Sequence, residues 1–216
     1  MECVLFGRRQ ILEAAAALAL AAVTLPAAAA EPVILVLGDS LSAEYGLKRG
    51  SGWVPLLEQR LAREGVPARV VNASISGDTT SGGRARLPAL LAQHRPTHVV
   101  IELGGNDALR GLPLQMTEAN IAAMTEAAQK SGARVLLLGM QLPPNYGRDY
   151  GERFAALYEQ VARRYDAALV PFFLKDVADV PDAARLFQPD RIHPTAEAQP
   201  IMLANVWPEL KKLLPK

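Results

Sequence analysis

The sequence predicts an α/β fold: a three-layer αβα sandwich with a five-stranded parallel sheet. Short apolar runs rich in Val, Ile and Leu alternate along the chain with longer segments whose apolar residues recur at helical spacing. Such runs are typical of strands buried on both faces, and their short connections to helices imply parallel strands covered on both sides. No repeat or linker interrupts residues 31–216, so we expect one domain there.

The expected elements alternate strictly. Strands are expected at residues 33–37, 68–71, 99–103, 135–138 and 168–173. Four apolar stripes indicate the helices between them: Trp53, Leu56, Leu57 and Leu61; Leu87, Leu90 and Leu91; Ile121, Met124 and Ala128; Phe154, Leu157 and Val161. A fifth helical segment, residues 195–214, ends the chain.

Polar segments that contain glycine or proline follow the expected strands. Ligands bind outside the carboxyl ends of the strands in sheets of this kind, so a site is expected in these segments. They read GDS at 38–40, NASISGDTTSGG at 72–83, GGND at 104–107, LPPNYG at 142–147 and DRIHP at 190–194. All five therefore converge on one rim.

Each segment has an ordinary structural explanation when it is taken alone. Ser40 could be a helix cap, Gly77 could be required by a positive φ, and Asn106 could bond its own turn. An Asp three residues before a His, as in Asp190 and His193, also occurs by chance. Their succession at the ends of successive strands favours one shared site.

Together the segments contain the groups that acyl transfer needs. A serine hydroxyl becomes a nucleophile when a base takes its proton, and imidazole suits that role near neutral pH. We therefore predict Ser40 as the nucleophile, His193 as the base and Asp190 as the carboxylate that orients it. The backbone N–H groups of Ser40 and Gly77 and the side-chain amide of Asn106 would form the oxyanion hole.

The blocks GDS, SISGDT, GGND and DRIHP resemble those of the SGNH, or GDSL, hydrolases, whose four name-giving residues match Ser40, Gly77, Asn106 and His193. From about Val33 to Trp207 the chain is similar to their arylesterase, acyl-CoA thioesterase I and lysophospholipase L1 branch; the longer stretches that match are NASISGDTTSGGRARLPALL, VIELGGNDALRG, LPPNYG and IHPTAEAQP. The resemblance implies a flavodoxin-like fold and a periplasmic or secreted esterase without cofactor, acting on small-molecule esters, acyl thioesters and lysophospholipids. The G-x-S-x-G elbow of α/β-hydrolases is absent around Ser40.

Other titratable residues near these motifs are interpreted as structural. Asp39 is expected to brace its loop by hydrogen bonds. His94 and His98 flank a helix-to-strand connection, which belongs on the opposite rim, and we expect both on the surface. Because the three histidines have no matching carboxylate cluster, no metal site is predicted.

The N-terminus predicts export. Arg8 and Arg9 precede an apolar run from Ala14 to Ala30 that closes on small residues, as in a cleaved signal peptide over residues 1–30. An uncleaved anchor is the alternative, and the sequence GRRQIL leaves the Sec or twin-arginine route open. We expect a periplasmic or secreted protein that begins at Glu31 and has no stable membrane insertion after processing.

Composition narrows the possible partners. The only cysteine, Cys3, lies in the predicted signal, so the mature chain has no disulfide and no cysteine nucleophile. The formal net charge is +1 without a Lys/Arg cluster, which indicates neither nucleic acid nor an anionic membrane surface as a partner. We expect a monomer that binds a small-molecule substrate.

The substrate is the least specified part of the prediction. The segment ALRGLPLQM, residues 108–116, is more apolar than a solvated loop, so Leu109, Leu112 and Leu114 either line an acyl chain or pack beneath the loop. Tyr146 could form the opposite wall. The function predicted is a serine esterase; the alternatives are a carbohydrate O-deacetylase and a non-catalytic periplasmic binding module.

Overall fold

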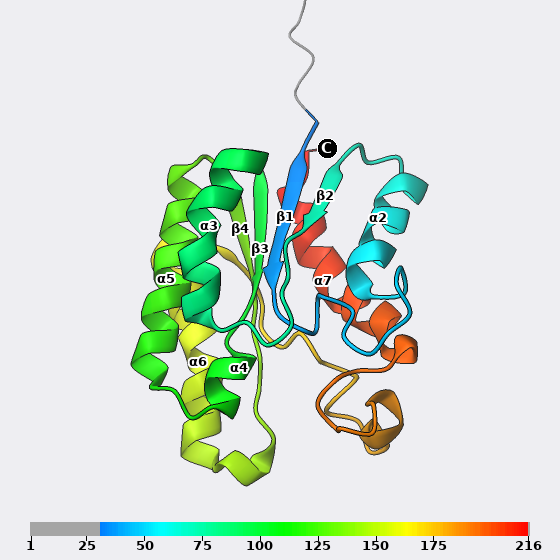
Figure 1. Ribbon diagram of the computed structural model, residues 1–216, viewed down its shortest axis with the longest axis vertical. Coiled ribbons are helices and arrows are strands. Elements are labelled where there is room, and N and C mark those ends of the chain that lie inside the picture. Colours follow the sequence, from blue (N-terminus) through cyan, green and yellow to red (C-terminus); the bar gives the residue numbers. More distant parts are fainter. Residues whose placement is uncertain (1–30, 216) are drawn as a thin grey trace, which may run out of the picture. The chain divides into compact units, whose positions relative to one another are not determined.

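A computed structural model describes residues 31–215, and these residues contain the predicted five-stranded parallel sheet (Figure 1). The strands are β1 (Val33–Gly38), β2 (Arg69–Asn72), β3 (His98–Glu102), β4 (Arg134–Leu138) and β5 (Ala168–Val170). Their order in the sheet, β2-β1-β3-β4-β5, is the flavodoxin-like order. The prediction of the fold is confirmed, whereas the predicted signal peptide lies outside the described residues.

Helices cover the sheet on both faces. On one face lie α2 (Trp53–Arg63) and α7 (Gln199–Leu213), and on the other lie α3 (Thr80–His94), α5 (Leu114–Lys130) and α6 (Arg148–Tyr165) (Figure 1). A short helix, α4 (Gly105–Leu109), follows β3 directly at the carboxyl rim. None of the helices in residues 31–215 has the length and apolar character that a membrane crossing requires.

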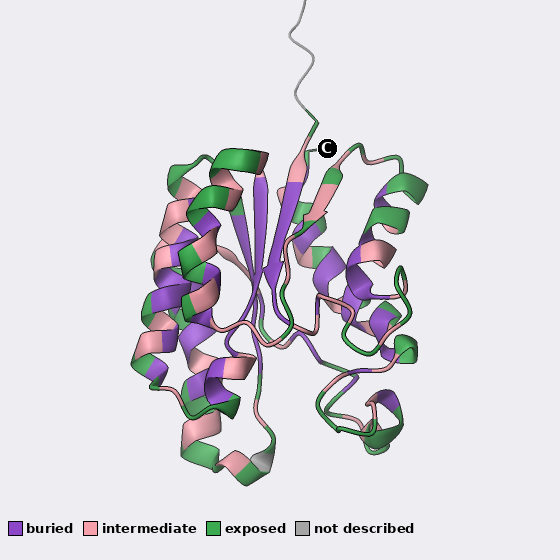
Figure 2. Ribbon diagram, in the orientation of Figure 1, coloured by how far each residue is buried: buried purple, intermediate pink, exposed green. Residues whose placement is uncertain are grey.

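The core lies along the central strands, where burial is concentrated (Figure 2). In β1, Ile34 to Leu37 are completely buried, and every residue of β3 is buried. The edge strand β2 is only half-buried because one of its sides has no neighbouring strand. The helical stripes are also confirmed: Trp53, Leu87, Ile121 and Phe154 are at most 1% exposed.

Two expected boundaries were wrong. The fifth strand ends at Val170 and not at residue 173, because Pro171 has no N–H to continue the ladder. The predicted loop over residues 108–116 is largely helical, since α4 extends to Leu109 and α5 begins at Leu114.

The prediction that His98 lies on the surface was also wrong. His98 begins β3 and is 4% exposed, with Nδ1 2.8 Å from Thr97 Oγ1 and Nε2 2.9 Å from the carbonyl oxygen of Leu213. Burial lowers the pKa of its imidazole. His94 is half-buried at the end of α3. Both histidines lie on the rim opposite the strand ends that carry the predicted site, as expected.

Candidate active site

Ser40 lies just beyond the end of β1. The preceding Gly38 is required there, because a Cβ atom at this position would come within 2.8 Å of Glu102 Oε2 and Ser42 Oγ. The chain then makes a series of turns, and the next helix, α2, begins only at Trp53 with Gly52 as its N-cap. Ser40 therefore caps no helix, which leaves its hydroxyl group for contacts at the rim.

The side chains of Ser40, His193 and Asp190 form one chain of hydrogen bonds. His193 Nε2 is 2.9 Å from Ser40 Oγ, and His193 Nδ1 is 2.7 Å from Asp190 Oδ2. An ionised Asp190 can only accept, so Nδ1 carries the hydrogen and Nε2 is left to accept from the Ser40 hydroxyl group. The structure thus brings together the three residues that the sequence suggested, in the order that proton removal from Ser40 requires.

Asp190 is held as an anion by its own loop. Its Oδ1 accepts hydrogen bonds from the backbone N–H groups of His193, at 3.0 Å, and Ile192, at 2.9 Å. These two bonds and the contact with the His193 ring lower the pKa of Asp190 to about 2. The carboxylate is therefore ionised at neutral pH and fixes the imidazole ring.

Two residues that the sequence analysis did not single out support the position of His193. The ring of Tyr45 lies against the imidazole, with a centroid distance of 4.3 Å and an interplanar angle of 37°. The Gln188 side chain donates to the carbonyl oxygens of Tyr45, at 2.9 Å, and Pro194, at 3.1 Å. Gln188 thereby connects the loop after Ser40 to the loop that carries His193.

The predicted oxyanion donors belong to the segments that follow β1, β2 and β3 at the carboxyl ends of the strands. Within residues 31–215 the backbone N–H groups of Ser40 and Gly77 are used in no hydrogen bond. Gly77 has a φ of +78°, which the backbone of a residue with a side chain rarely adopts. The Gly77 carbonyl group is held by Arg110 Nη2 at 2.8 Å.

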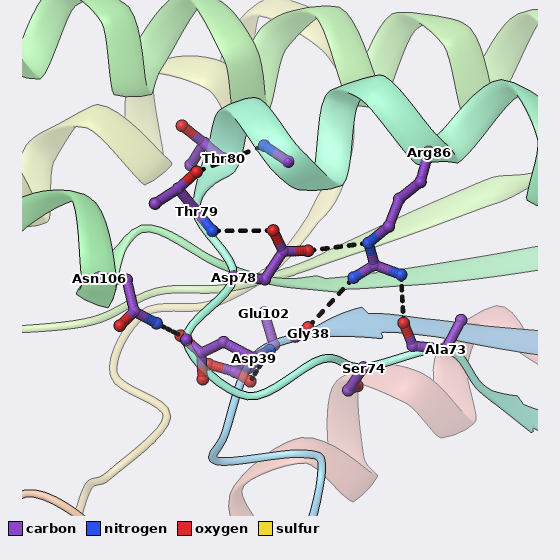
Figure 3. A network of polar contacts seen from close by, with 12 residues as sticks. Gly38, Asp39, Ala73, Ser74, Asp78, Thr79, Thr80, Arg86, Glu102 and Asn106 are labelled. Carbon is purple, nitrogen blue, oxygen red and sulfur yellow. Dashed lines mark hydrogen bonds and ion pairs between the residues drawn. The ribbon is translucent and has the colours of Figure 1, made fainter.

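Arg86 holds the segment that carries Gly77 in place (Figure 3). From α3 its Nε pairs with Asp78 Oδ2 at 2.8 Å, and its other nitrogens donate to the carbonyl oxygens of Ala73 and, at 3.3 Å, Gly38. One side chain therefore connects the end of β1 to both ends of the 73–78 segment. The sequence pattern could not reveal this role, because the local sequence does not show which groups an arginine on a helix will contact.

The Asn106 amide points at a carboxyl group and not at its own turn. Its Nδ2 donates to Asp39 Oδ2 at 2.9 Å (Figure 3). Asp39 Oδ1 accepts from the backbone N–H of Leu41 at 3.0 Å. Asp39 braces its loop as expected. An amide nitrogen has two hydrogens, and within residues 31–215 only one of those on Asn106 is used.

The next residue fixes the helix that carries Asn106. Asp107 is completely buried and accepts from the backbone N–H of Thr80 at 2.9 Å and from the hydroxyl group of Thr117 at 3.3 Å. It also bonds the Thr80 hydroxyl group. These contacts attach α4 to the starts of α3 and α5. The GGND segment therefore stabilises the packing of these helices and also carries Asn106 at the carboxyl ends of the strands.

The predicted substrate residues divide between core and surface. Leu114 is buried, Leu112 and Tyr146 are half-buried, and Leu109 is 45% exposed. Within the described residues the other large apolar side chains with comparable exposure are Tyr45, Ile75 and Ile192. Each of the four lies within five residues of Ser40, Gly77, Asn106 or His193 in the sequence. The segments that carry the predicted site therefore also carry exposed apolar side chains.

Comparison with known proteins decides the family. Residues 36–200 match the GDSL-like Lipase/Acylhydrolase family. The chain belongs to this family. The resemblance seen in the sequence is thus confirmed.

Named relatives support the same branch. The chain is 56% identical over 195 residues to "Esterase TesA" of Pseudomonas aeruginosa, which covers 90% of this chain and 96% of the relative. It is 43% identical to "Thioesterase 1/protease 1/lysophospholipase L1" of Escherichia coli over 87% of each chain.

Solved structures agree. A crystal structure of TesA, 56% identical, superposes with a TM-score of 0.81 over 84% of this chain and 99% of that one. The esterase EstA from Pseudoalteromonas sp., inhibited by monoethylphosphonate and 41% identical, gives a TM-score of 0.79 over 84% and 98%.

Proposed function

We propose that the protein is a serine esterase that hydrolyses carboxylic esters and acyl thioesters through an acyl-enzyme intermediate. The observation that carries the proposal is the hydrogen-bonded chain from Ser40 through His193 to Asp190 in a member of an acylhydrolase family. Membership of the family and the relatives named esterase and thioesterase support the reaction class.

The reaction begins with attack of Ser40 Oγ on the acyl carbon. As the C–O bond forms, the hydroxyl proton moves to His193 Nε2, and Asp190 stabilises the resulting imidazolium. The carbonyl oxygen becomes an oxyanion that receives hydrogen bonds from the N–H groups of Ser40 and Gly77 and from the amide of Asn106. His193 returns the proton to the leaving alcohol or thiol, and the acyl group stays on Ser40.

Water completes the cycle. His193 takes a proton from a water molecule, whose oxygen attacks the acyl carbon, and the second tetrahedral intermediate collapses with return of that proton to Ser40 Oγ. The products are a carboxylic acid and the free serine. No metal or cofactor is needed by this scheme, because the proton is carried by His193 and the negative charge is stabilised by N–H groups.

The apolar rim favours an acyl chain over a sugar. A carbohydrate O-deacetylase would need a polar surface with aromatic platforms. Of the four exposed apolar side chains, Ile75, Leu109 and Ile192 are aliphatic, and the one aromatic ring, that of Tyr45, lies against His193. A binding module would have no use for a serine hydroxyl group aligned with an imidazole. Both alternatives are therefore weaker than the esterase.

Location and assembly are part of the proposal. We infer a cleaved signal over residues 1–30, a periplasmic or secreted domain over residues 31–216, and a monomer. Intact mass of the exported protein tests the first point, because processing after Ala30 leaves Glu31 at the N-terminus. A mass that retains residues 1–30 would overturn the inferred cleavage.

The activity is tested with a fluorophosphonate probe and a substrate series. The probe should label wild-type protein and should not label Ser40→Ala, which should also lose ester hydrolysis while it keeps its thermal midpoint. Hydrolysis of p-nitrophenyl esters and acyl-CoA thioesters of increasing chain length, beside an acetylated sugar, separates the esterase from both alternatives. Labelling that survives in Ser40→Ala, or a preference for the sugar, would contradict the proposal.

A further inference from the structure

Two buried carboxyl groups lie beside the site, and the reaction scheme above uses neither. Asp39 follows β1 and is 3% exposed, and Glu102 ends the neighbouring strand β3 and is 2% exposed. The parallel pairing of Gly38 with Glu102 brings them together, and the backbone N–H of Asp39 donates to Glu102 Oε2 at 3.3 Å. Two ionised carboxylates in this contact would repel each other strongly away from water, so the pair must hold a proton.

Two donors converge on one oxygen of Glu102. Its Oε2 accepts from the Ser42 hydroxyl group at 2.7 Å and from the backbone N–H of Asp39 at 3.3 Å. The indole N–H of Trp53 in turn donates to the Ser42 oxygen at 3.1 Å. With the Ser42 hydrogen directed at Glu102, a proton on Glu102 can be donated to Asp39.

The contacts of Asp39 are those of an anion. It accepts from Leu41 and from the Asn106 amide, and the Glu102 proton adds a third donor. Burial raises the pKa of Asp39 to about 6, and it raises that of Glu102 well above its usual range, with the Asp39 charge as the second cause. The two N–H donors on Asp39 and the higher pKa of Glu102 favour Glu102 as the protonated partner.

No cationic side chain is placed to neutralise a second negative charge on the Asp39–Glu102 pair among residues 31–215. Among residues 31–215 no Lys or Arg forms an ion pair with either carboxyl group; the nearby Arg86 pairs with Asp78. The other titratable groups that face the pair are Tyr158, from α6, and His193, from the loop after β5. The Tyr158 hydroxyl group donates to the carbonyl oxygen of Leu103 at 2.9 Å and gives the pair no proton.

We propose that Asp39 and protonated Glu102 form a positioning pair that orients Asn106 in the oxyanion hole. The two hydrogens of an amide nitrogen lie in a fixed plane, so holding one of them on Asp39 fixes the direction of the other. Glu102 acts on Asn106 only through Asp39, because the hydrogen bond from protonated Glu102 holds the Asp39 carboxylate in place as an acceptor. This inference rests on the proposed role of Asn106 as an oxyanion donor.

A double-mutant cycle between Asp39 and Asn106 tests the inference. In Asp39→Asn, one of the three donors to Asp39 would face an NH₂ group and not an acceptor oxygen. We expect kcat for p-nitrophenyl butyrate to fall about 10-fold with KM nearly unchanged, which is less than the loss expected when an oxyanion donor is removed completely. In the Asn106→Ala background the same substitution should change kcat by less than about 2-fold, because the group it positions is gone.

The cycle tests the oxyanion role of Asn106 separately from its positioning by Asp39 and Glu102. If Asn106→Ala itself has near-normal kcat, the oxyanion role under the proposed function fails. If Asn106→Ala is impaired and Asp39→Asn lowers kcat equally in both backgrounds, the positioning pair is overturned while the oxyanion role stands.

Glu102 is tested by a conservative and a non-conservative substitution. Glu102→Gln still donates to Asp39 and accepts from Ser42, so its kcat should stay within about 3-fold of wild type, whereas Glu102→Leu should match the loss in Asp39→Asn. A loss in Glu102→Gln as large as that in Asp39→Asn would overturn the inference. If Glu102→Leu fails to fold, Glu102→Gln and the cycle still decide.

Thr125→Val provides the control for lost stability. Thr125 is completely buried on α5, and its hydroxyl group bonds the carbonyl oxygen of Ile121 at 2.8 Å within the same helix. Its substitution should lower the thermal midpoint without lowering kcat. If Thr125→Val lowers kcat as much as Asp39→Asn, the effect of Asp39 is one of general destabilisation and the inference is wrong.

Discussion

His193 Nε2 lies 2.9 Å from Ser40 Oγ, although 153 positions of sequence separate the two residues. The contact depends on the sheet, because Ser40 follows the central strand β1 and His193 lies in the long connection from β5 to α7. Gln188 and Tyr45 connect these two loops directly. The geometry for proton transfer is thus set by the fold and then adjusted by contacts between loops.

His193→Ala should abolish most of the activity. Removing the base leaves Ser40 without a proton acceptor, so kcat should fall by at least about 10⁴-fold. His94→Ala is the control because His94 is half-buried on the opposite rim, and it should keep near-normal kcat. Steady-state kinetics with p-nitrophenyl butyrate measure both. A loss in His94→Ala equal to that in His193→Ala would mean that the wrong histidine had been chosen.

Gln188→Ala should lower kcat without unfolding the protein. The substitution removes the side-chain hydrogen bond to Tyr45, which joins the loops of Ser40 and His193, and the one to Pro194 within the His193 loop. Each is worth about 1 kcal/mol, so alignment should suffer and kcat should fall about 10-fold. Gln129→Ala is a matched control, because Gln129 also donates to a backbone carbonyl, that of Tyr165 at 2.6 Å, between α5 and the end of α6. Equal kcat in the two variants would exclude a positioning role for Gln188.

Glu102→Gln should change how stability depends on pH. Burial raises the pKa of Glu102 in the folded state, so its contribution to stability is fully present below the unfolded pKa and is lost as pH rises toward the folded value. Glutamine does not titrate. Between pH 5 and 8 the free energy of unfolding of Glu102→Gln should therefore rise relative to wild type, by up to about 1.4 kcal/mol per pH unit.

Urea unfolding at several pH values measures this difference. Glu126→Gln serves as the matched glutamate-to-glutamine control, since the Glu126 side chain is 46% exposed and pairs with Lys130 on α5. A pH dependence of Glu102→Gln no different from that of Glu126→Gln would contradict the protonated state on which the positioning pair depends.

The elements that the sequence revealed are those with a strong local signal. Buried central strands are largely apolar on both faces, so β1, β3 and β4 appear as apolar runs, and α2 and α6 show a clear stripe of buried residues. The five residues of α4 are too few to show any period. Pro171 was a signal that the fifth strand ends early, and the apolar residues on both sides of it concealed it.

The site was predictable where the motif residues touch one another and not where they touch the scaffold. Ser40, Asp190 and His193 are recognisable because acyl transfer requires those residue types. The partners of His98 and Glu102, which are 115 and 60 positions away, leave no mark in the local sequence. Buried polar groups find their partners through the tertiary fold, so a single sequence shows the charged residue and not its environment.

Asn106→Ala distinguishes an oxyanion donor from a structural residue. The side chain bonds Asp39, so its removal should cost about 1 kcal/mol of stability in either case, and a lower thermal midpoint alone decides nothing. An oxyanion donor strengthens its bond chiefly in the transition state, so kcat should also fall about 10²–10³-fold, with little change in KM. Ser131→Ala is the control for stability, because the Ser131 hydroxyl group bonds the carbonyl oxygen of Ala128 at the end of α5, away from the rim. Thermal melting and steady-state kinetics on the same preparations measure both effects, and a destabilised Asn106→Ala with near-normal kcat would remove this residue from the oxyanion hole.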